Sequence, residues 1–236
     1  MTGIEIIPTN TCPPDFSELS RRSEVFAAFA SVMQLDLDDG IFAPEISWPY
    51  RKSQWEEIEA MAKAGRKLPF SEQLKYEAHL MVQDPLRIGG FLARMNCTRI
   101  ISHIEVFENA RSVQESFASW KNAGATECGL AILIDTPLSV LNACVADCDV
   151  VQFMSIASLG KQGAPFDIRV IGRISELHTR NPKLSISVDG GVAESNIVEL
   201  VRAGARRFGV GSAISKATDP AAAYAKLKAL AESAIV

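Results

Sequence analysis

Residues 184–212 read LSISVDGGVAESNIVELVRAGARRFGVGS, and this stretch decides the fold class. Two short apolar runs, Leu184–Val188 and Arg207–Val210, enclose a segment whose apolar residues recur at helical spacing from Ile197 to Val201. A strand, a helix and a second strand in this order predict parallel strands, because parallel neighbours need a crossover of about a dozen residues or more. The stretch therefore predicts one βαβ unit of a parallel sheet.

The same alternation of apolar runs and amphipathic segments continues over the rest of the chain. Eight βα units can close into a barrel, and a barrel of this kind takes about 250 residues, close to the 236 present. We therefore predict a single TIM (β/α)₈ barrel of the phosphate-binding type, which occupies residues 1–236 as one domain. A short helix is expected over 138–146. The runs expected as strands are Ile4–Ile7, Val32–Leu37, Tyr76–Val82, Arg99–Ile104, Gly129–Ile134, Val150–Met154, Leu184–Val188 and Arg207–Val210.

Composition and charge exclude several classes of function. A net charge of −4 and a pI near 5.5 do not provide the basic face that nucleic-acid binding needs. No apolar run is long enough to cross a bilayer, and Met1–Pro14 lacks the layout of a signal peptide. The five cysteines form no CxxC pair, which favours free thiols in a reducing compartment. We expect a cytoplasmic homo-oligomer that binds neither nucleic acid nor membranes.

Polar residues stand at the ends of several predicted strands, within otherwise apolar runs. Gln34, Asp36 and Asp38 share one face of their strand through the two-residue period, and such a set cannot pack in a dry interior without partners. In this type of barrel the C-terminal ends of the strands form the active site. The residues that would meet at this mouth are Asp36, His79, His103 and Asp189.

Each of these residues also has a purely structural interpretation. A single histidine at a strand end is more often a hydrogen-bonded structural residue than a ligand. An aspartate that precedes Gly190-Gly191 can simply initiate a turn. Four such residues at matching strand ends favour a functional site.

Glycine turns follow the last two predicted strands. Gly190-Gly191 comes after the seventh strand, and Gly211-Ser212 comes after the eighth. Glycines let backbone N–H groups approach an anion closely, and a helix that begins there adds a favourable dipole. The alternative is that these glycines only make tight βα turns. Because phosphate-binding barrels hold the anion at these two loops, the pair favours a phosphate site.

Several segments, in chain order, resemble the ribulose-phosphate 3-epimerase family. Residues 35–44 (LDLDDGIFAP) are similar to the family's DVMDGHFVPN segment, and residues 78–85 (AHLMVQDP) to its VHLMVxxP segment. The resemblance covers nearly the whole chain. Four further segments are similar to family segments: His103-Ile104-Glu105 to HxE, Asp135-Thr136-Pro137-Leu138 to the end of NPxTPL, residues 188–192 (VDGGV) to VDGGI, and residues 210–214 (VGSAI) to AGSAI.

This resemblance implies an isomerase that interconverts D-ribulose 5-phosphate and D-xylulose 5-phosphate, by proton removal and return at C3 through an enediolate. It makes Asp36 and Asp189 the catalytic acid/base pair. It also implies a divalent metal ion (Zn, Fe or Mn) on Asp36, His79 and Asp189, with Gln34 at the position of the fourth family ligand. The residues that it assigns to the sugar phosphate are Thr9, Met81, His103, Gly160, Gly190, Gly191, Gly211 and Ser212.

The chain departs from the family pattern at several positions. Gln34 stands where the family has a histidine ligand, and an amide oxygen binds transition metals more weakly than imidazole. Asp38 replaces a methionine, and the loop 157–163 differs from the family's NPGFGGQ; Asp38 or Glu45 could supply a replacement ligand. These changes leave open an epimerase of a different phosphorylated ketose, or a non-catalytic phosphosugar-binding barrel without metal. Because both catalytic aspartates are present, catalysis is favoured. The lysine that a related orotidine-phosphate-type decarboxylase or aldolase would need at position 38 is absent.

Overall fold

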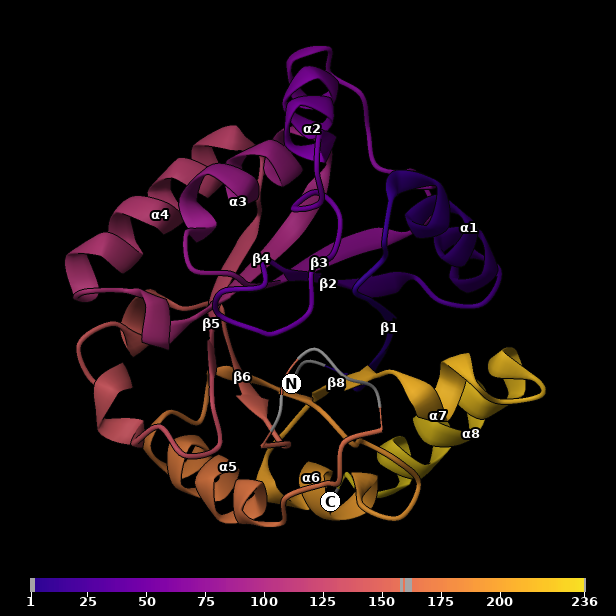
Figure 1. The fold of residues 1–236 in the computed structure, drawn as a ribbon. Helices are drawn as coiled ribbons and strands as arrows, with labels where there is room; N and C mark the ends of the chain where they lie inside the picture. The colour runs from indigo at the N-terminus through magenta and orange to yellow at the C-terminus, as the bar shows by residue number, and fades with distance from the viewer. Residues whose placement is uncertain (1–2, 158, 160–162, 236) are drawn as a thin grey trace.

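The structure, a computed structural model, describes residues 3–157, 159 and 163–235. Each of the eight apolar runs overlaps a strand, and the strands pair in parallel and in chain order until β8 meets β1. The helices form a ring around this closed barrel (Figure 1). The predicted TIM (β/α)₈ barrel is therefore confirmed. The strands are β1 (Glu5–Thr11), β2 (Val32–Asp38), β3 (Lys75–Met81), β4 (Cys97–His103), β5 (Glu127–Ile132), β6 (Val150–Met154), β7 (Ser185–Asp189) and β8 (Arg207–Val210).

Capping residues fix where several helices begin. Asp84 caps α3 and is followed by Pro85, and Asp219 caps α8 before Pro220, the arrangement in which proline loses no helical hydrogen bond. Within the described part of the chain, no helix is long and apolar enough to span a membrane. The α-helices are α1 (Phe16–Ala27), α2 (Gln54–Lys63), α3 (Pro85–Arg94), α4 (Ala110–Ala123), α5 (Arg169–Arg180), α6 (Ile197–Ala203), α7 (Ser212–Ser215) and α8 (Pro220–Ser233).

The connection from β5 to β6 differs from the expectation of one short helix over 138–146. Two 3₁₀ helices, η2 (Leu138–Leu141) and η3 (Val145–Asp147), occupy it instead, and a further one, η1 (Ile104–Val106), follows β4. A segment of this length gains too few hydrogen bonds to offset the cost of nucleating an α-helix. Leu141 and Cys144, both buried, anchor it to the core.

Side-chain alternation along the strands separates an outer from an inner layer. On β2, Leu35 and Leu37 belong to the main core between strands and helices, so the residues between them point into the barrel. On β4 the inward positions are Arg99, Ile101 and His103. Ile101 packs with Ala131 and Val150 into a small apolar cluster of its own. On this side of the barrel the cluster lies between a lower and an upper group of polar residues.

The lower group, at the N-terminal ends of the strands, is a network of arginines and glutamates. Arg99 Nη1 lies 2.8 Å from Glu5 Oε2, and Arg207 Nη2 lies 2.6 Å from Glu127 Oε2. Glu77 is fully buried at its centre, 3.8 Å from Arg99 and 4.0 Å from Arg207, and its oxygens accept no hydrogen bond from the described residues. Burial raises the pKa of Glu77 to about 7, against the opposing charges of the two arginines.

The raised pKa of Glu77 predicts that the free energy of unfolding falls as the pH rises. The Glu77→Gln variant should lack this pH dependence. Because the folded-state pKa of about 7 exceeds the ordinary value of 4.5, the stability that neutral Glu77 provides is present below pH 4.5 and is lost as the pH rises through 7. We expect the variant and the wild type to unfold alike in urea near about pH 5 and the variant to be more stable near about pH 8, by up to about 3 kcal/mol.

Glu127→Gln is the matched control, because it removes contacts to Arg99 and Arg207 that do form. It should lower the free energy of unfolding at both pH values. A Glu77→Gln variant that is less stable than the wild type near about pH 8 would contradict this account of the network.

Candidate active site

The C-terminal ends of β2, β3 and β7 bring three charged side chains together inside the barrel. The pairing of β2 with β3 places Asp36 directly beside His79, and Asp189 ends β7 next to Gly209 of β8. A Cβ atom at position 209 would lie 3.0 Å from Asp189 Oδ1 and 3.1 Å from Gln34 Oε1, closer than ordinary contacts. Glycine at this position therefore gives the two side chains room inside the barrel.

His79 Nδ1 lies between the two carboxylates. It is 3.4 Å from Asp36 Oδ1 and 3.3 Å from Asp189 Oδ2, and the ligand atoms of all three residues lie within 4.8 Å of one another. His79 is fully buried, and only 4% of Asp36 is exposed. Two carboxylates this close in a buried place repel each other unless a positive or hydrogen-donating group lies between them.

Gln34 supplies the second group between the carboxylates. Its Nε2 donates to Asp36 Oδ1 at 2.7 Å and to Asp189 Oδ2 at 3.0 Å, and it lies 3.5 Å from His79 Nδ1. Its Oε1 is buried and has no hydrogen-bond partner among the residues that the structure describes. The amide thus satisfies both carboxylates but leaves its own carbonyl oxygen unsatisfied.

These four side chains fit a small divalent cation. Ligand atoms of a tetrahedral site with bonds of about 2.0 Å lie about 3.3 Å apart, and the separations around His79 Nδ1 are 3.3 and 3.4 Å. Two carboxylates and an imidazole suit zinc, iron or manganese. Because an amide exchanges its oxygen and nitrogen by rotation, the unsatisfied Oε1 of Gln34 can serve as a fourth donor.

Electrostatics at this centre favour positive charge. Burial raises the pKa of Asp36 and the charge of Asp189 raises it further, while hydrogen bonding to His79 opposes both. Burial lowers the pKa of His79, but its hydrogen bonds to Asp189 and Asp36 outweigh burial and raise that pKa to about 10. The two carboxylates that hold a proton on His79 would hold a metal cation in its place.

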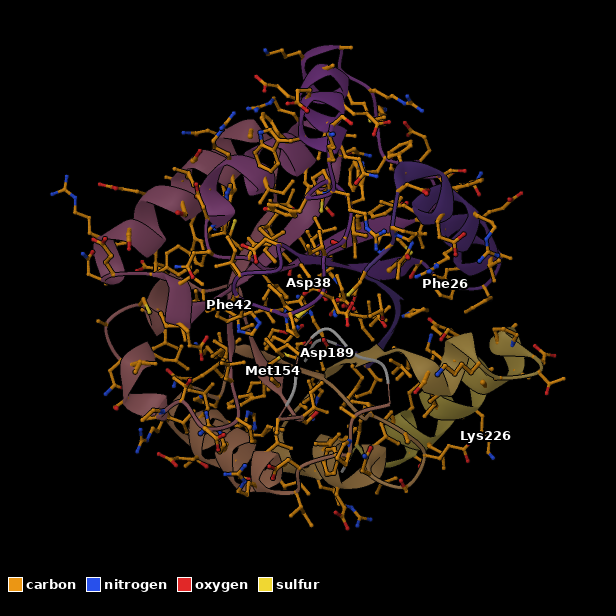
Figure 2. All side chains as sticks on the ribbon, in the orientation of Figure 1. Phe26, Asp38, Phe42, Met154, Asp189 and Lys226 are labelled. Atoms are coloured by element: carbon orange, nitrogen blue, oxygen red, sulfur yellow. The ribbon has the colours of Figure 1, made fainter. Side chains whose placement is uncertain are left out.

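A cavity opens at the C-terminal mouth of the barrel above this centre. Asp36 and Asp189 line it, with Met154 and Ile156 as part of its apolar wall. Figure 2 shows Asp38, Asp189 and Met154 close to the centre of the barrel. The residues predicted to contact the sugar phosphate that also line this cavity are Thr9, Met81, Gly190, Gly191, Gly211 and Ser212.

Other residues singled out in the sequence lie elsewhere. His103 is fully buried behind His79, is not among the described residues that line the cavity, and has a pKa that burial lowers to about 4. Its contact with substrate stays a prediction. Gly160 lies outside the described residues. Asp38 accepts a hydrogen bond from the Cys12 thiol, and Glu45 lines a neighbouring pocket beside α1.

Two residues that the sequence analysis missed hold the glycine loop after β7. Ser155 Oγ donates to Asp189 O at 3.0 Å and also to Gly190 O, and Asn196 Nδ2 donates to Gly191 O at 2.9 Å. Both glycines have positive φ, 108° and 64°, which favours glycine at these positions. Ser155 follows β6 directly, so the search for polar residues at strand ends could have found it. Asn196 carries no comparable signal.

Residues 7–215 match the sequence model of the Ribulose-phosphate 3 epimerase family. The chain belongs to this family. A ribulose-phosphate 3-epimerase from Aquifex aeolicus is 33% identical over 210 residues, which cover 87% of each chain. The ribulose-phosphate 3-epimerase of Escherichia coli is 28% identical over 214 residues, which cover 89% of this chain and 88% of that one.

Solved structures of other sugar-phosphate enzymes share the barrel. A 3-keto-L-gulonate-6-phosphate decarboxylase from Vibrio cholerae superimposes with a TM-score of 0.72 at 9% identity, and each chain is covered fully. A 3-hexulose-6-phosphate synthase gives a TM-score of 0.64 at 16% identity, with 96% of this chain and 99% of that one covered. At these identities the likeness shows the fold alone.

The neutral amide at position 34 predicts weak metal binding that a histidine would strengthen. Gln34→His replaces a poor donor by imidazole beside three ligands that are already in place, so we expect affinity for zinc and manganese to rise at least about 10-fold. Titration against a chelating indicator measures this affinity. The exposed Gln83→His is the control and should leave it unchanged. Wild-type protein that keeps one metal per chain through dialysis against a chelator would contradict the prediction.

Proposed function

We propose that this protein interconverts D-ribulose 5-phosphate and D-xylulose 5-phosphate. Family membership gives the reaction class. The observation that carries the proposal is that two carboxylates, the buried Asp36 on β2 and the largely buried Asp189 on β7, meet at the floor of one cavity. Epimerisation at a carbon next to a ketone needs two acid/base groups, one for each face of that carbon.

Asp36 and Asp189 perform the two proton transfers in this proposal. One enters the turnover as a carboxylate and removes the C3 proton, leaving an enediolate. The other enters as a carboxylic acid and returns a proton to the opposite face of C3, so the product is the epimer and no net proton is consumed. In the reverse reaction the two residues exchange roles.

The enediolate carries negative charge that must be stabilised beside two acidic residues. A divalent cation on Asp36, His79 and Asp189 would, when bound, polarise the C2 ketone and stabilise the enediolate. His79 Nδ1 and Gln34 Nε2 hold the two carboxylates in place, since both atoms lie within 3.5 Å of each of them. The apolar wall of Met81, Met154 and Ile156 excludes water from the intermediate.

The phosphate group is placed, in this proposal, at the loops after β7 and β8. Gly190, Gly191, Gly211 and Ser212 line the same cavity as the two aspartates, so a single five-carbon sugar phosphate can reach both. Positive φ at Gly190 and Gly191 turns the backbone sharply there, and the absence of Cβ atoms lets its N–H groups approach an anion. Thr9, at the end of β1, lines the cavity as well.

Asp189→Asn tests the acid/base assignment. The amide keeps the size of the side chain but cannot exchange a proton, so we expect interconversion of the two pentulose phosphates to fall at least about 100-fold. Binding of D-ribulose 5-phosphate, measured by calorimetry, should remain. Asp135→Asn, which alters an exposed carboxylate paired with Arg169, is the control and should keep the wild-type rate. An Asp189→Asn variant with the wild-type rate would exclude Asp189 from the mechanism.

The same assay separates the alternative functions. Wild-type turnover of a ketohexose phosphate without turnover of D-ribulose 5-phosphate would favour an epimerase of a different ketose. Binding of both sugars without turnover of either, in protein supplied with zinc or manganese, would favour a non-catalytic phosphosugar-binding barrel.

A further inference from the structure

A series of hydrogen bonds extends from the active centre through His79 Nε2, the ring nitrogen that faces away from Asp36 and Asp189. His79 Nε2 lies 3.0 Å from His103 Nε2, and His103 Nδ1 lies 3.2 Å from Glu105 Oε2. The backbone N–H of Leu133, on the loop after β5, donates to the other carboxylate oxygen, Glu105 Oε1, at 2.8 Å. Both histidines are fully buried. None of these contacts takes part in the proton transfers at Asp36 and Asp189.

The direction of each hydrogen bond in this series follows from the protonation state of Glu105, the residue farthest from the active centre. Burial raises the pKa of Glu105, but hydrogen bonds from His103, Thr136 and Leu133 outweigh it and lower that pKa, so Glu105 is a carboxylate that only accepts. His103 must then carry its proton on Nδ1, which leaves a lone pair on its Nε2. That lone pair can accept only if His79 carries a proton on Nε2. When a cation replaces the proton that Asp36 and Asp189 hold on His79 Nδ1, the remaining proton stays on Nε2 and the Nδ1 lone pair faces the cation.

The packing of the rings prevents this series from rearranging. The rings of His79 and His103 meet edge to edge, with centroids 5.1 Å apart and 28° between their planes, and Phe42 packs on His103 with centroids 4.7 Å apart. A ring flip of His103 would break its contacts with both His79 and Glu105. The orientation of the imidazoles is therefore fixed, and only the position of their protons remains to be set.

We propose that Glu105 is a positioning residue that, through His103, fixes the tautomer of His79 and keeps its Nδ1 lone pair toward the metal-binding centre. The metal part of this inference rests on the proposed function, but the tautomer part does not. Partners of this kind orient metal-ligating histidines in proteins, and their loss typically weakens metal binding about 10- to 100-fold. Here one further side chain, His103, stands between the carboxylate and the ligating histidine.

Glu105→Gln should reverse the whole series. Because the Leu133 N–H still needs an acceptor, the amide oxygen of the variant would face Leu133 and its NH₂ group would face His103. His103 Nδ1 must then accept, so its proton moves to Nε2. His79 Nε2 must accept in turn, which places the only proton of neutral His79 on Nδ1. The atom that should bind the cation is then blocked.

The test uses nitrogen-15 NMR of histidine-labelled protein, in which only three imidazoles give signals. His178, on α5, is assigned by His178→Asn, and His103 is assigned by its contact with Phe42. In metal-free wild type we expect a proton on Nδ1 of His103 and a proton on each nitrogen of His79, one facing His103 and one facing the two carboxylates. In Glu105→Gln we expect the His103 proton on Nε2 and the only His79 proton on Nδ1, and zinc affinity to fall about 10- to 100-fold. Glu108→Gln, the same change at an exposed position three residues away, should alter neither.

Three results would overturn the proposal. The first is a wild type in which His103 carries its proton on Nε2. The second is a Glu105→Gln variant whose histidine signals match those of the wild type. The third is a variant with reversed protons and unchanged zinc affinity. The proton positions are measured without substrate or metal. The first two results could therefore be obtained even if the protein proved not to be an epimerase.

Discussion

Two carboxylates that must lie close together away from water are the constraint on which the rest of this structure depends. Asp36 and Asp189 come from strands that are far apart in the chain, and each is drawn to the same two atoms, His79 Nδ1 and Gln34 Nε2. Without those atoms their mutual repulsion would disfavour bringing both charges together here. The glycine at position 209 is needed for the same reason, since a side chain there would occupy the space that the pair requires.

The barrel interior also holds a second group of charges. The lower network of Glu5, Arg99 and Glu127 lies at the N-terminal ends of the strands, and on β4 Ile101, with its small apolar cluster, lies between Arg99 and His103. Charges that are paired in this way stabilise the fold only modestly, but removing one partner leaves a buried charge that is costly. The register of β2 on β3 places Asp36 beside His79.

Much of this arrangement could be predicted from the sequence, because strands and their polar ends are local properties. The eight strands and the convergence of Asp36, His79 and Asp189 follow from apolar runs and from the two-residue period. Contacts across the barrel could not be predicted in this way. The approach of Gln34 Nε2 to both carboxylates depends on the shear of the barrel, as does the hydrogen bond between His103 and His79. The prediction of one short helix at 138–146 was wrong, because this segment is too short to nucleate an α-helix.

The central claim is that Asp36 and Asp189 act on opposite faces of one carbon, and the fate of the C3 proton tests it most directly. The measurement follows D-ribulose 5-phosphate in deuterium oxide by proton NMR during the first few per cent of conversion. Two bases predict that D-xylulose 5-phosphate forms with deuterium at C3 while the remaining substrate is still unlabelled, because the group that returns the proton has equilibrated with solvent. Product that keeps the original proton at C3 would show that a single group carries it across, and would contradict the account.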